Sequence, residues 1–498
     1  MKLLLINPKF PESFWSYRWA VENVFAGKRA LSPPLGLATL AALSPADWQI
    51  EIVDENIEEV PCESDADIVG ICGMGVQFRR QKQLLEAFRR QGHYVVAGGS
   101  FASLCPERFD GIADCVVAGE SEYIWKEFCR DFAASVAKPL YRETGEVALA
   151  DSPVPRFDLL KLDRYEAVSL QFSRGCPFRC EFCDIIVMFG RKPRTKSLDQ
   201  VARELDCLRD RGVRNVFFVD DNLIGDKRLA KRLLRFLRAY QLEHDYWFSF
   251  GTEASLNVAG DEELLDLFRA ANFEWIFIGI ESPDEESLKE TLKFQNTRGD
   301  MLESVRKIYS YGIDVLAGFI IGFDHDTSAI FQKQYDFVMK SGIQAAMIGL
   351  LVAIPKTPLH RRLAESGRLS ELDITDNTKL GTNVIPSGMG YDEMVDGYRA
   401  LYRRLVADRA IADRINNKVR YFVGGLEKGT DSLLDELGIL ARLLVFGVLR
   451  GGPGRLFHFA RSIPFSRPSL IPVAIRDWVI GLTIRDYVDR ELAVPPAV

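Results

Sequence analysis

The stretch SRGCPFRCEFCD, residues 173–184, holds three of the nine cysteines of the chain within eight residues. Cys176, Cys180 and Cys183 have the spacing CxxxCxxC and follow an apolar run typical of a strand. A structural zinc site normally takes four protein ligands, often in CxxC pairs, and neither a second pair nor a histidine lies near this loop. Three thiolates on a four-iron, four-sulfur cluster would leave one iron open for a small molecule. Three unrelated buried thiols remain the other alternative, and their tight spacing argues against it.

The loop opens a series of strand and helix patterns that runs over residues 166–365. Six apolar runs alternate with helical stretches such as DQVARELDCLRDRG. The runs are SLQFSRGC, NVFFVDDN, YWFSFGTEA, WIFIGIES, VLAGFIIGFD and AAMIGLLVAIP. This order predicts an open or partial (β/α)6 barrel whose chemistry lies at the carboxyl ends of its strands.

The rest of the chain divides into three further segments. Residues 1–135 contain five short strand patterns separated by helical ones, which predicts an α/β, doubly wound, Rossmann-like domain. Residues 136–165 are rich in Pro and Asp and are expected to form a linker. Residues 366–498 lack strand patterns after the barrel and are expected to form a mostly helical domain.

Composition excludes several classes of protein. The chain has 498 residues, of which 47% are hydrophobic, and a formal net charge of −7, which argues against nucleic acid as the main partner. Six cysteines are scattered singly, so they form no disulfide framework. The opening MKLLLINPKF predicts a buried first strand rather than a signal peptide, and no run of 18 uncharged apolar residues predicts a membrane span. We therefore expect a cytoplasmic protein.

With an aromatic residue, Phe182, before the third cysteine, the CxxxCxxC loop resembles the signature of the radical S-adenosylmethionine (SAM) superfamily. This resemblance implies a [4Fe-4S] cluster on Cys176, Cys180 and Cys183, whose open iron chelates SAM. It also assigns candidate SAM contacts at the ends of strands. The ordinary alternative is a structural role, since acidic residues there often cap helices and glycines often form turns. These contacts are Phe182 near adenine, Asp220 or Asp221 for the amino group, Glu281 for ribose, and Gly318, Ile320 and Gly322 of a GxIxG pattern.

The N-terminal segment, with SPPLGL at residues 32–37, resembles the start of cobalamin-binding radical SAM enzymes. By this resemblance a corrinoid would lie on the loops that follow the strands. The loop residues are Asn7, Pro8, Gly73, Met74, Gln77, Gly98, Gly99, Ser100, Gly119 and Glu120. The DxHxxG motif that supplies a histidine to cobalt elsewhere is absent, and His93 precedes a strand. Met74 and Gln77 are the candidates for the lower face of cobalt, and a domain that has lost its cofactor is the alternative.

The whole chain resembles the cobalamin-dependent branch that includes the hopanoid 2-methylase. This resemblance implies methyl transfer to an unactivated carbon of a lipid-like or tetrapyrrole-like substrate, with a flavodoxin or ferredoxin as electron donor. A cyclase, oxidase or carbon–carbon coupling enzyme with the same cofactors is the first alternative, and a non-catalytic sensor is the second. The stretch 438–468 has five Arg and no acid among Leu, Phe and Val. It predicts either a peripheral contact with the inner membrane or an ordinary helical pair.

Aromatic residues near the barrel are expected to line the pocket of such a substrate, although aromatic residues in strands more often belong to the core. These residues are Trp247, Phe250, Trp275 and Phe323.

Overall fold

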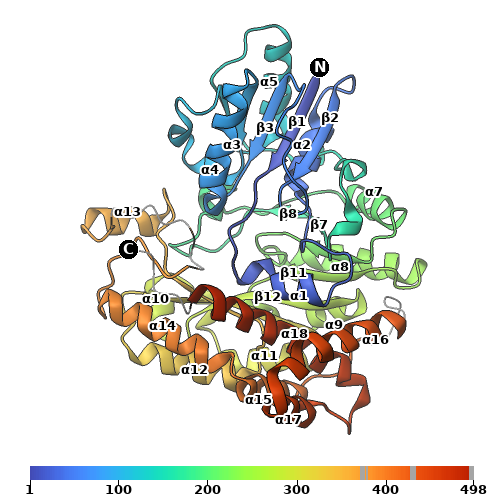
Figure 1. Cartoon of the computed structure of the whole chain (residues 1–498), viewed down its shortest axis with the longest axis vertical. Coiled ribbons are helices and arrows are strands. Elements are labelled where there is room, and N and C mark those ends of the chain that lie inside the picture. Colours follow the sequence, from blue (N-terminus) through green and yellow to red (C-terminus); the bar gives the residue numbers. More distant parts are fainter. Residues whose placement is uncertain (371–375, 377–378, 427–432, 493–498) are drawn as a thin grey trace.

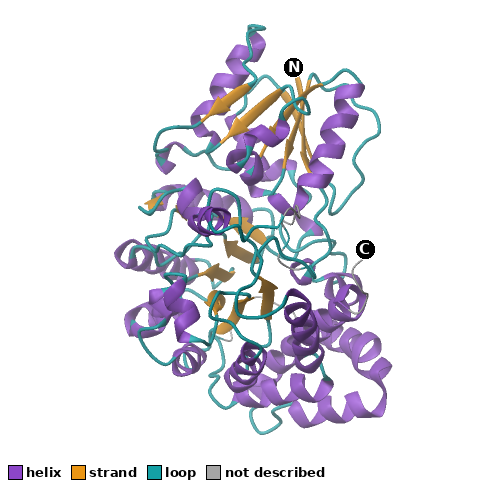
Figure 2. Ribbon diagram, turned by 90° about the vertical axis from the view of Figure 1, so that its left-hand side faces the viewer, coloured by secondary structure: helices purple, strands orange, loops and turns teal. Residues whose placement is uncertain are grey.

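The computed structural model describes residues 1–370, 376, 379–426 and 433–492, so parts of the expected helical segment 366–498 lie outside the described residues. Two sheets are stacked along the long axis of the molecule, and helices flank both of them (Figures 1 and 2). The N-terminal sheet lies above the barrel sheet, and the C-terminal helices cover the lower part of the barrel (Figure 1). This confirms the expected α/β architecture with a helical C-terminal region.

The first sheet has six parallel strands in the order β2-β1-β3-β4-β5-β6. Its strands are β1 Lys2–Asn7, β2 Gln49–Asp54, β3 Ile68–Cys72, β4 Tyr94–Gly98, β5 Cys115–Ala118 and β6 Leu140–Arg142. Its helices are α2 Leu35–Leu43, α3 Phe78–Arg90, α4 Ser100–Leu104 and α5 Ser121–Ala133. The strand order reverses beside β1, which places a ligand crevice at the carboxyl ends of the strands.

The sixth strand was not expected, because β6 lies within the segment 136–165 that the composition predicted to be a linker. It has only three residues, too few for a pattern of alternating burial to be recognised. Tyr141 anchors it: the ring is buried and the hydroxyl donates to Asp131 of α5 at 3.0 Å. The N-terminal sheet therefore extends beyond residue 135.

The second sheet is also parallel, with the order β14-β13-β12-β11-β10-β7, and it contains the six expected strands. They are β7 Val168–Leu170, β10 Asn215–Phe218, β11 Ser249–Glu253, β12 Phe273–Glu281, β13 Asp314–Ile321 and β14 Ala346–Leu350. A short antiparallel hairpin, β8 Ser173–Arg174 with β9 Arg194–Thr195, brackets the cysteine loop. The helices are α6 Ile185–Met188, α7 Leu198–Arg209, α8 Lys227–Glu243, α9 Glu262–Ala270, α10 Glu285–Glu290, α11 Met301–Tyr309, α12 Ala329–Ser341 and α13 Pro358–Glu365.

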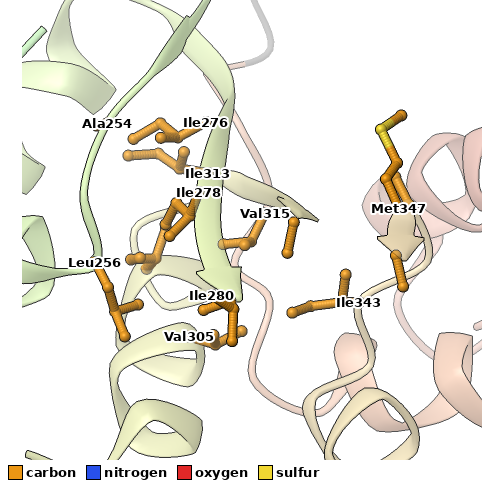
Figure 3. Packing of buried hydrophobic residues seen from close by; sticks show 14 of the residues in the cluster. Ala254, Leu256, Ile276, Ile278, Ile280, Val305, Ile313, Val315, Ile343 and Met347 are labelled. Carbon is orange, nitrogen blue, oxygen red and sulfur yellow. The ribbon is translucent and has the colours of Figure 1, made fainter. Parts of the chain in front are cut away.

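Alternation along β12 separates the core from the barrel interior. Ile276, Ile278 and Ile280 point toward the outer helices and pack with Val305 of α11 (Figure 3). Their neighbours Phe277 and Gly279 face the interior and are only partly buried. Because successive side chains of a strand point to opposite faces, a single strand supplies both the core and the wall of the site.

Helices follow the strands at points where the sequence supplies acidic caps. The side chains of four aspartates accept hydrogen bonds from the first-turn amides of α8, α9, α10 and α11; they are Asp226, Asp261, Asp284 and Asp300. Such caps satisfy amides that have no partner within the helix, so each helix begins close to its strand.

The C-terminal helices pack on the side of the barrel at β13 and β14. They are α14 Tyr391–Leu405, α15 Asp408–Val419, α16 Leu433–Arg442, α17 Gly452–Ser462 and α18 Ile471–Tyr487; a π-helical turn, Leu443–Val448, follows α16, and another, Val488–Leu492, follows α18. A buried ion network joins them to the barrel: the Lys418 ammonium lies 2.8 Å from both Asp314 of β13 and Asp477 of α18.

The N-terminal segment between β1 and α2 leaves its own domain. Its helix α1, Arg18–Asn23, packs on α18, and Arg490 forms an ion pair with Glu12. Trp15 lies over Phe277 of β12, with ring centroids 5.2 Å apart. The segment therefore connects the N-terminal sheet, the barrel interior and the C-terminal helices.

Candidate active site

The cysteine loop begins where β7 ends, and two aspartates from the neighbouring strand hold its start. Asp220, after β10, accepts hydrogen bonds from the amides of Phe172 and Ser173 and from the Ser173 hydroxyl. Asp221 accepts one from the amide of Gly175 at 2.7 Å. Both side chains thus bind the residues directly ahead of Cys176, a role that acidic residues at a strand end did not by themselves reveal.

The three cysteines lie close together in a polar but buried setting. Asn222 approaches the Cys176 sulfur at 3.9 Å, and Gln295 approaches the Cys180 sulfur at 3.5 Å. Burial, with a contribution from the neighbouring thiols, raises the pKa of Cys176 and of Cys183. Within the described ranges no three His, Cys, Asp or Glu side chains converge as the ligands of a single metal ion do. The three thiols of the loop are the candidate ligands of an iron–sulfur cluster.

The middle of the loop is fixed from the opposite side of the barrel. The Arg362 guanidinium of α13 binds both Glu181, at 2.6 Å, and Asp324, at 2.6 Å. The amide of Glu181 donates to Thr291, and its carbonyl accepts from the amide of Leu359. Glu181 lies between Cys180 and Phe182. These contacts therefore fix the backbone next to Cys180 and Cys183 without involving their sulfur atoms.

Glu281 stands at the end of β12 in a strained conformation. Its φ of +64° lies in the left-handed region, and the register with β13 shifts just before it. Asn296 donates to the carbonyls of Gly279 and Ile280 and holds this bulge. Non-glycine residues in this region occur preferentially at functional sites, because the surrounding structure must compensate for the strain.

The Glu281 carboxylate forms an ion pair with Lys293 at 2.7 Å, and both groups are buried. Burial alone would lower the pKa of Lys293, but the charges of Glu281 and of the Cys180 sulfur raise it. The Lys293 ammonium also lies 5.9 Å from the ring of Phe182. Glu281 was expected from the sequence, whereas Lys293, twelve residues further along the chain, is marked by no motif.

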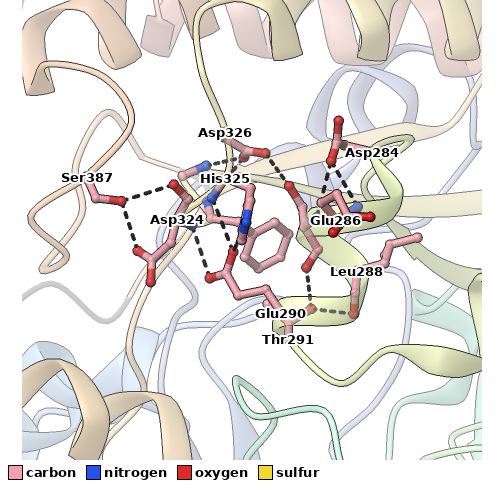
Figure 4. A network of polar contacts seen from close by, with 12 residues as sticks. Asp284, Glu286, Leu288, Glu290, Thr291, Asp324, His325, Asp326 and Ser387 are labelled. Carbon is pink, nitrogen blue, oxygen red and sulfur yellow. Dashed lines mark hydrogen bonds and ion pairs between the residues drawn. The ribbon is translucent and has the colours of Figure 1, made fainter.

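The two glycines of the GxIxG pattern at the end of β13 are closely packed by neighbouring side chains. A Cβ on Gly318 would come within 3.1 Å of the Phe277 ring, and Gly322 has a φ of +113°. Asp326 accepts hydrogen bonds from the Gly322 and Phe323 amides and from Ser287 (Figure 4). This network fixes Phe323 beside Phe182, with ring centroids 6.0 Å apart.

Glu253 completes an acidic group that the sequence analysis did not single out. It ends β11, and its carboxylate has no hydrogen-bond or ion-pair partner among the described residues, although Asp220 and Asp221 lie near enough to influence its pKa. Burial raises the pKa of Glu253 to about 7, that of Asp220 to about 7 and that of Asp221 to about 6. Three carboxyl groups with weakened acidity form a site that a cation, such as an ammonium group, would stabilise.

This acidic group makes the stability of the cofactor-free protein depend on pH. The folded pKa of Glu253 lies above the ordinary value of 4.5, so its contribution to stability is present below that value and is lost as the pH rises through about 7. We expect the thermal unfolding midpoint to fall between pH 5 and pH 8. Glu253→Gln should make this fall shallower by about the contribution of one titrating proton. Glu243→Gln, at an exposed position on α8, should leave the pH dependence unchanged. Equal slopes in all three proteins would contradict the assignment.

The candidate cobalamin residues lie at the carboxyl edge of the first sheet. A Cβ on Gly99, whose φ is +100°, would come within 2.4 Å of the Gly73 carbonyl oxygen, so the loops after β3 and β4 touch through their backbones. Gly98 precedes Gly99 at the end of β4, and Gly119, whose φ is +112°, follows β5. Side chains are thereby kept off this edge, which is what a large flat ligand needs.

Gln77 and Met74 have different settings. The Gln77 amide is buried, donates to Asn7 at 3.1 Å and to the Pro8 carbonyl at 2.5 Å, and accepts from the Met74 amide. Met74 is 52% exposed. The His93 ring lies at the opposite edge of the sheet, with Nδ1 2.8 Å from the carbonyl oxygen of Ala66.

Two adjoining cavities separate this edge from the barrel. The larger measures about 1350 Å³, beyond the roughly 300–1,000 Å³ of pockets for drug-sized ligands, and the smaller about 490 Å³. Both are lined by Gly99 and Ser100 of the first domain and by Val219 after β10 of the barrel. Residues 7–37, including SPPLGL, form much of the wall of the larger one. The size and the glycine edge fit a corrinoid.

Glu120 links the two domains. Its carboxylate forms ion pairs with Arg174 at 2.7 Å and with Arg194 at 2.8 Å, on the two strands that bracket the cysteine loop. Arg174 also pairs with Glu122 at 2.8 Å. All of these groups are largely buried, so the cofactor loops of one domain are held against the cysteine loop of the other.

Removing the charge of Glu120 should loosen this junction. Glu120→Gln leaves Arg194 buried without its carboxylate, which costs about 3 kcal/mol in comparable buried pairs. We expect a lower midpoint for the first thermal unfolding transition and faster proteolysis between the domains. Glu127→Gln on α5, which removes only a solvent-accessible ion pair with Lys138, should leave both nearly unchanged. Identical midpoints for Glu120→Gln and the native protein would refute the junction role.

Several aromatic residues lie elsewhere than expected. Trp247 precedes β11, at the amino end of the strand, and its indole donates to the Val213 carbonyl. Phe250 is fully buried in the core, and Trp275 stacks on Phe217 near the start of its strand. Phe323 is at the carboxyl end but is packed against Phe182. Trp15 and Phe277, which the sequence analysis did not select, are partly open to the barrel interior.

Comparison with known proteins agrees with this geometry. Residues 170–338 match the Radical SAM superfamily, and residues 357–491 match a domain of unknown function (DUF4070). An uncharacterized methyltransferase of Synechocystis sp. is 38% identical, over 99% of this chain and 95% of its own length. Hopanoid C-2 methylase of Rhodopseudomonas palustris is 33% identical, over 84% of this chain and 80% of its own.

Among solved structures, the cobalamin-dependent SAM radical enzyme OxsB has the same fold. It has a TM-score of 0.63 and 14% identity, and the match covers 99% of this chain and 80% of OxsB. The cysteine loop at the end of β7, the six-stranded barrel and the full-length relatives agree on one assignment: the chain belongs to the radical SAM superfamily and, within it, to the methyltransferase family of the Synechocystis and Rhodopseudomonas proteins.

Proposed function

We propose that this protein is a cobalamin-dependent radical SAM methyltransferase that methylates an unactivated carbon of a hydrophobic substrate. The observation that carries the proposal is the shared cavity: the carboxyl edges of a glycine-rich sheet and of a radical SAM barrel face each other across it. Bound there, the cluster supplies reductive cleavage of SAM and cobalamin supplies a transferable methyl group. The arrangement would hold a substrate between the two, and such positioning is a large part of catalysis.

The residues of the chain divide the work. Cys176, Cys180 and Cys183 would hold the cluster and leave one iron open. The Glu253 carboxylate would accept hydrogen bonds from the SAM ammonium group, and the Glu281–Lys293 pair would orient the rest of that molecule beside Phe182. Hydrogen abstraction from carbon needs no acid or base, and accordingly no catalytic dyad is required here.

The loops of the first sheet would hold the corrinoid. Gly73, Gly98, Gly99 and Gly119 would face the macrocycle, and the exposed Met74 would be the side chain nearest its lower face. The buried Gln77 would position Asn7 and Pro8 rather than approach the cobalt, because both ends of its amide already have partners. Glu120 would act indirectly, by fixing this edge against the cysteine loop.

The substrate is proposed to be lipid-like, with a tetrapyrrole-like molecule as the other member of the class. A relative that covers most of the chain is named for hopanoid C-2 methylation, and Trp15, which packs on Phe277, lines the larger cavity. A flavodoxin or ferredoxin would supply electrons. The cytoplasm provides both reductants, and a peripheral contact with the inner membrane would bring the enzyme to a lipid.

The test is an anaerobic assay of the protein reconstituted with iron, sulfide and cobalamin and supplied with SAM and a strong reductant. Methylation predicts 5′-deoxyadenosine and S-adenosylhomocysteine together, and a product heavier by one methyl group when lipid extracts are added. If 5′-deoxyadenosine forms without S-adenosylhomocysteine, a cyclase, oxidase or coupling reaction replaces methyl transfer. If neither forms, the non-catalytic sensor is favoured over an enzyme.

A further inference from the structure

The segment 436–465 of the C-terminal domain, which we call the apolar arm, exposes large apolar side chains. Six of them are between 44% and 71% exposed: Leu437, Val445, Leu449, Leu456, Phe457 and Phe465. Single exposed apolar residues are common, but six along thirty residues of one chain segment are characteristic of an interaction surface. The arm lies at the lower edge of the molecule, where α16 and α17 are seen in Figure 1.

The geometry of the arm suits a membrane surface and not a membrane span. By length and composition alone, Glu436–Ser462 passes as a spanning helix, and with only 17% of its most apolar window buried inside the protein it is not a core helix. Gly452, with a φ of +76°, breaks it into two helical pieces. Neither piece presents the roughly 20 consecutive apolar residues that cross a bilayer, because Arg442 and Arg450 interrupt the first, and the second, Gly452–Ser462, has only 11 residues. Two short helices with exposed apolar side chains would lie in the interface plane.

The other face of the arm is packed on the protein. Leu443, Gly447 and Phe459 are buried, and a Cβ on Gly447 would come within 2.6 Å of Leu482 of α18. α17 packs on α15, and the indole of Trp478 donates to Ser462. The arm is therefore a fixed amphipathic platform, so little ordering entropy opposes its docking.

The charge of the arm complements an anionic surface. The arm contains four Arg, at positions 442, 450, 455 and 461, and one acid, Glu436, at its first position. Arg455 and Arg461 pair with Asp408 and Asp413 of α15. Arg450 is exposed, lies 5.1 Å from the ring of Phe446, and has no carboxylate partner in the described part of the chain. An arginine beside exposed apolar side chains is placed to meet lipid phosphates.

The arm is continuous with the larger cavity. Arg442 and Phe446 line that cavity, while Val445 and Leu449, on the same helical piece, are exposed to solvent. One helix thus has a cavity side and a solvent side. A protein partner seated on the arm would close this opening, whereas a bilayer would deliver an apolar molecule to it.

We infer that the apolar arm docks into the headgroup layer of an anionic bilayer and that a hydrophobic substrate enters the cavity past Arg442 and Phe446. The docking stands by itself, and the entry route rests on the proposed function. The arm belongs to the C-terminal domain, and the exposed residues chosen for testing make no contact with the cysteine loop or the cofactor edge.

Flotation of the full-length protein with vesicles tests the docking without any turnover. Vesicles of phosphatidylcholine with phosphatidylglycerol should carry the protein upward, and salt should weaken the binding. The double variant Leu449→Glu/Phe457→Glu should reduce the bound fraction at least about tenfold, because two apolar anchors are lost. Leu242→Glu, at a 55% exposed position on α8, is the matched control and should bind normally. Thermal midpoints should be equal in all three.

Two results would overturn the docking. One is native protein that stays with the soluble fraction in the presence of anionic vesicles. The other is a dimer, seen by light scattering, that the double variant abolishes while vesicle binding never occurs; the arm would then be an interface between copies.

The entry route has a separate readout. The double variant should lose turnover of a vesicle-embedded lipid substrate and keep turnover of the same substrate in detergent. If the double variant turned over the vesicle-embedded and the detergent-dissolved substrate equally well, the entry route would be wrong and the methyltransferase assignment would stand. If the native protein bound vesicles but methylated no substrate in detergent, the docking would stand and the proposed function would fail.

Discussion

Cys180→Ala should bring the formation of 5′-deoxyadenosine to background and remove the iron–sulfur absorption of the reconstituted protein. Cys180 is buried and receives a hydrogen bond from Gln295, and a cluster held by three thiolates cannot lose one and keep its open iron in place. Iron content, visible absorption and the electron paramagnetic resonance signal of the reduced protein measure the loss directly.

The matched control is Cys207→Ala. Cys207 is a partly buried thiol on α7, outside the loop, and its loss should change neither iron content nor product formation. If Cys180→Ala retained a full cluster, the three-cysteine assignment would be wrong, because another ligand would have to replace the sulfur.

The second large effect is expected in stability rather than in catalysis. Lys418→Met removes the ammonium that lies 2.8 Å from Asp314 and from Asp477, where all three side chains are at most 2% exposed. Breaking a buried ion pair from one side typically costs about 3–5 kcal/mol, since it leaves charge without compensation. Thermal and denaturant unfolding should both show the loss. Arg476, which pairs with Asp314 at 2.9 Å, would limit it.

Two further variants identify the cause. Lys340→Met, at an exposed position on α12, should leave stability unchanged. Adding Asp477→Asn to Lys418→Met should recover part of the loss, because one of the two stranded carboxylates is then neutral. A double variant less stable than Lys418→Met would indicate lost packing instead of stranded charge.

The parts of the fold that the sequence predicted are those with local signals. Strands such as β12 show alternation and end in Gly, Glu or Asp, and the CxxxCxxC loop carries its chemistry within eight residues. All five expected strands of the first sheet and all six of the barrel are present. β6 escaped detection because three residues carry no period, and its pairing with β5 depends on Tyr141 reaching α5.

The site was predictable where a residue stands at the end of a strand, and not where distant segments meet. Lys293 reaches Glu281 only because the chain folds back after α10, and Arg362 reaches Glu181 from 181 positions away. Glu253 was within reach, since it ends the run YWFSFGTEA as the other acids end theirs. The partners of Glu120 and the wall formed by residues 7–37 required the two domains to be docked.

That wall has a consequence for how the protein is made. Residues 8–30 leave the ribosome long before α18, on which α1 packs. Domains generally fold as units during synthesis. The first sheet and the barrel can therefore form while the segment between β1 and α2 is still unpacked. The larger cavity can therefore enclose a cofactor only after α18 has been synthesised, because α1 must pack on α18 before the segment between β1 and α2 is fixed.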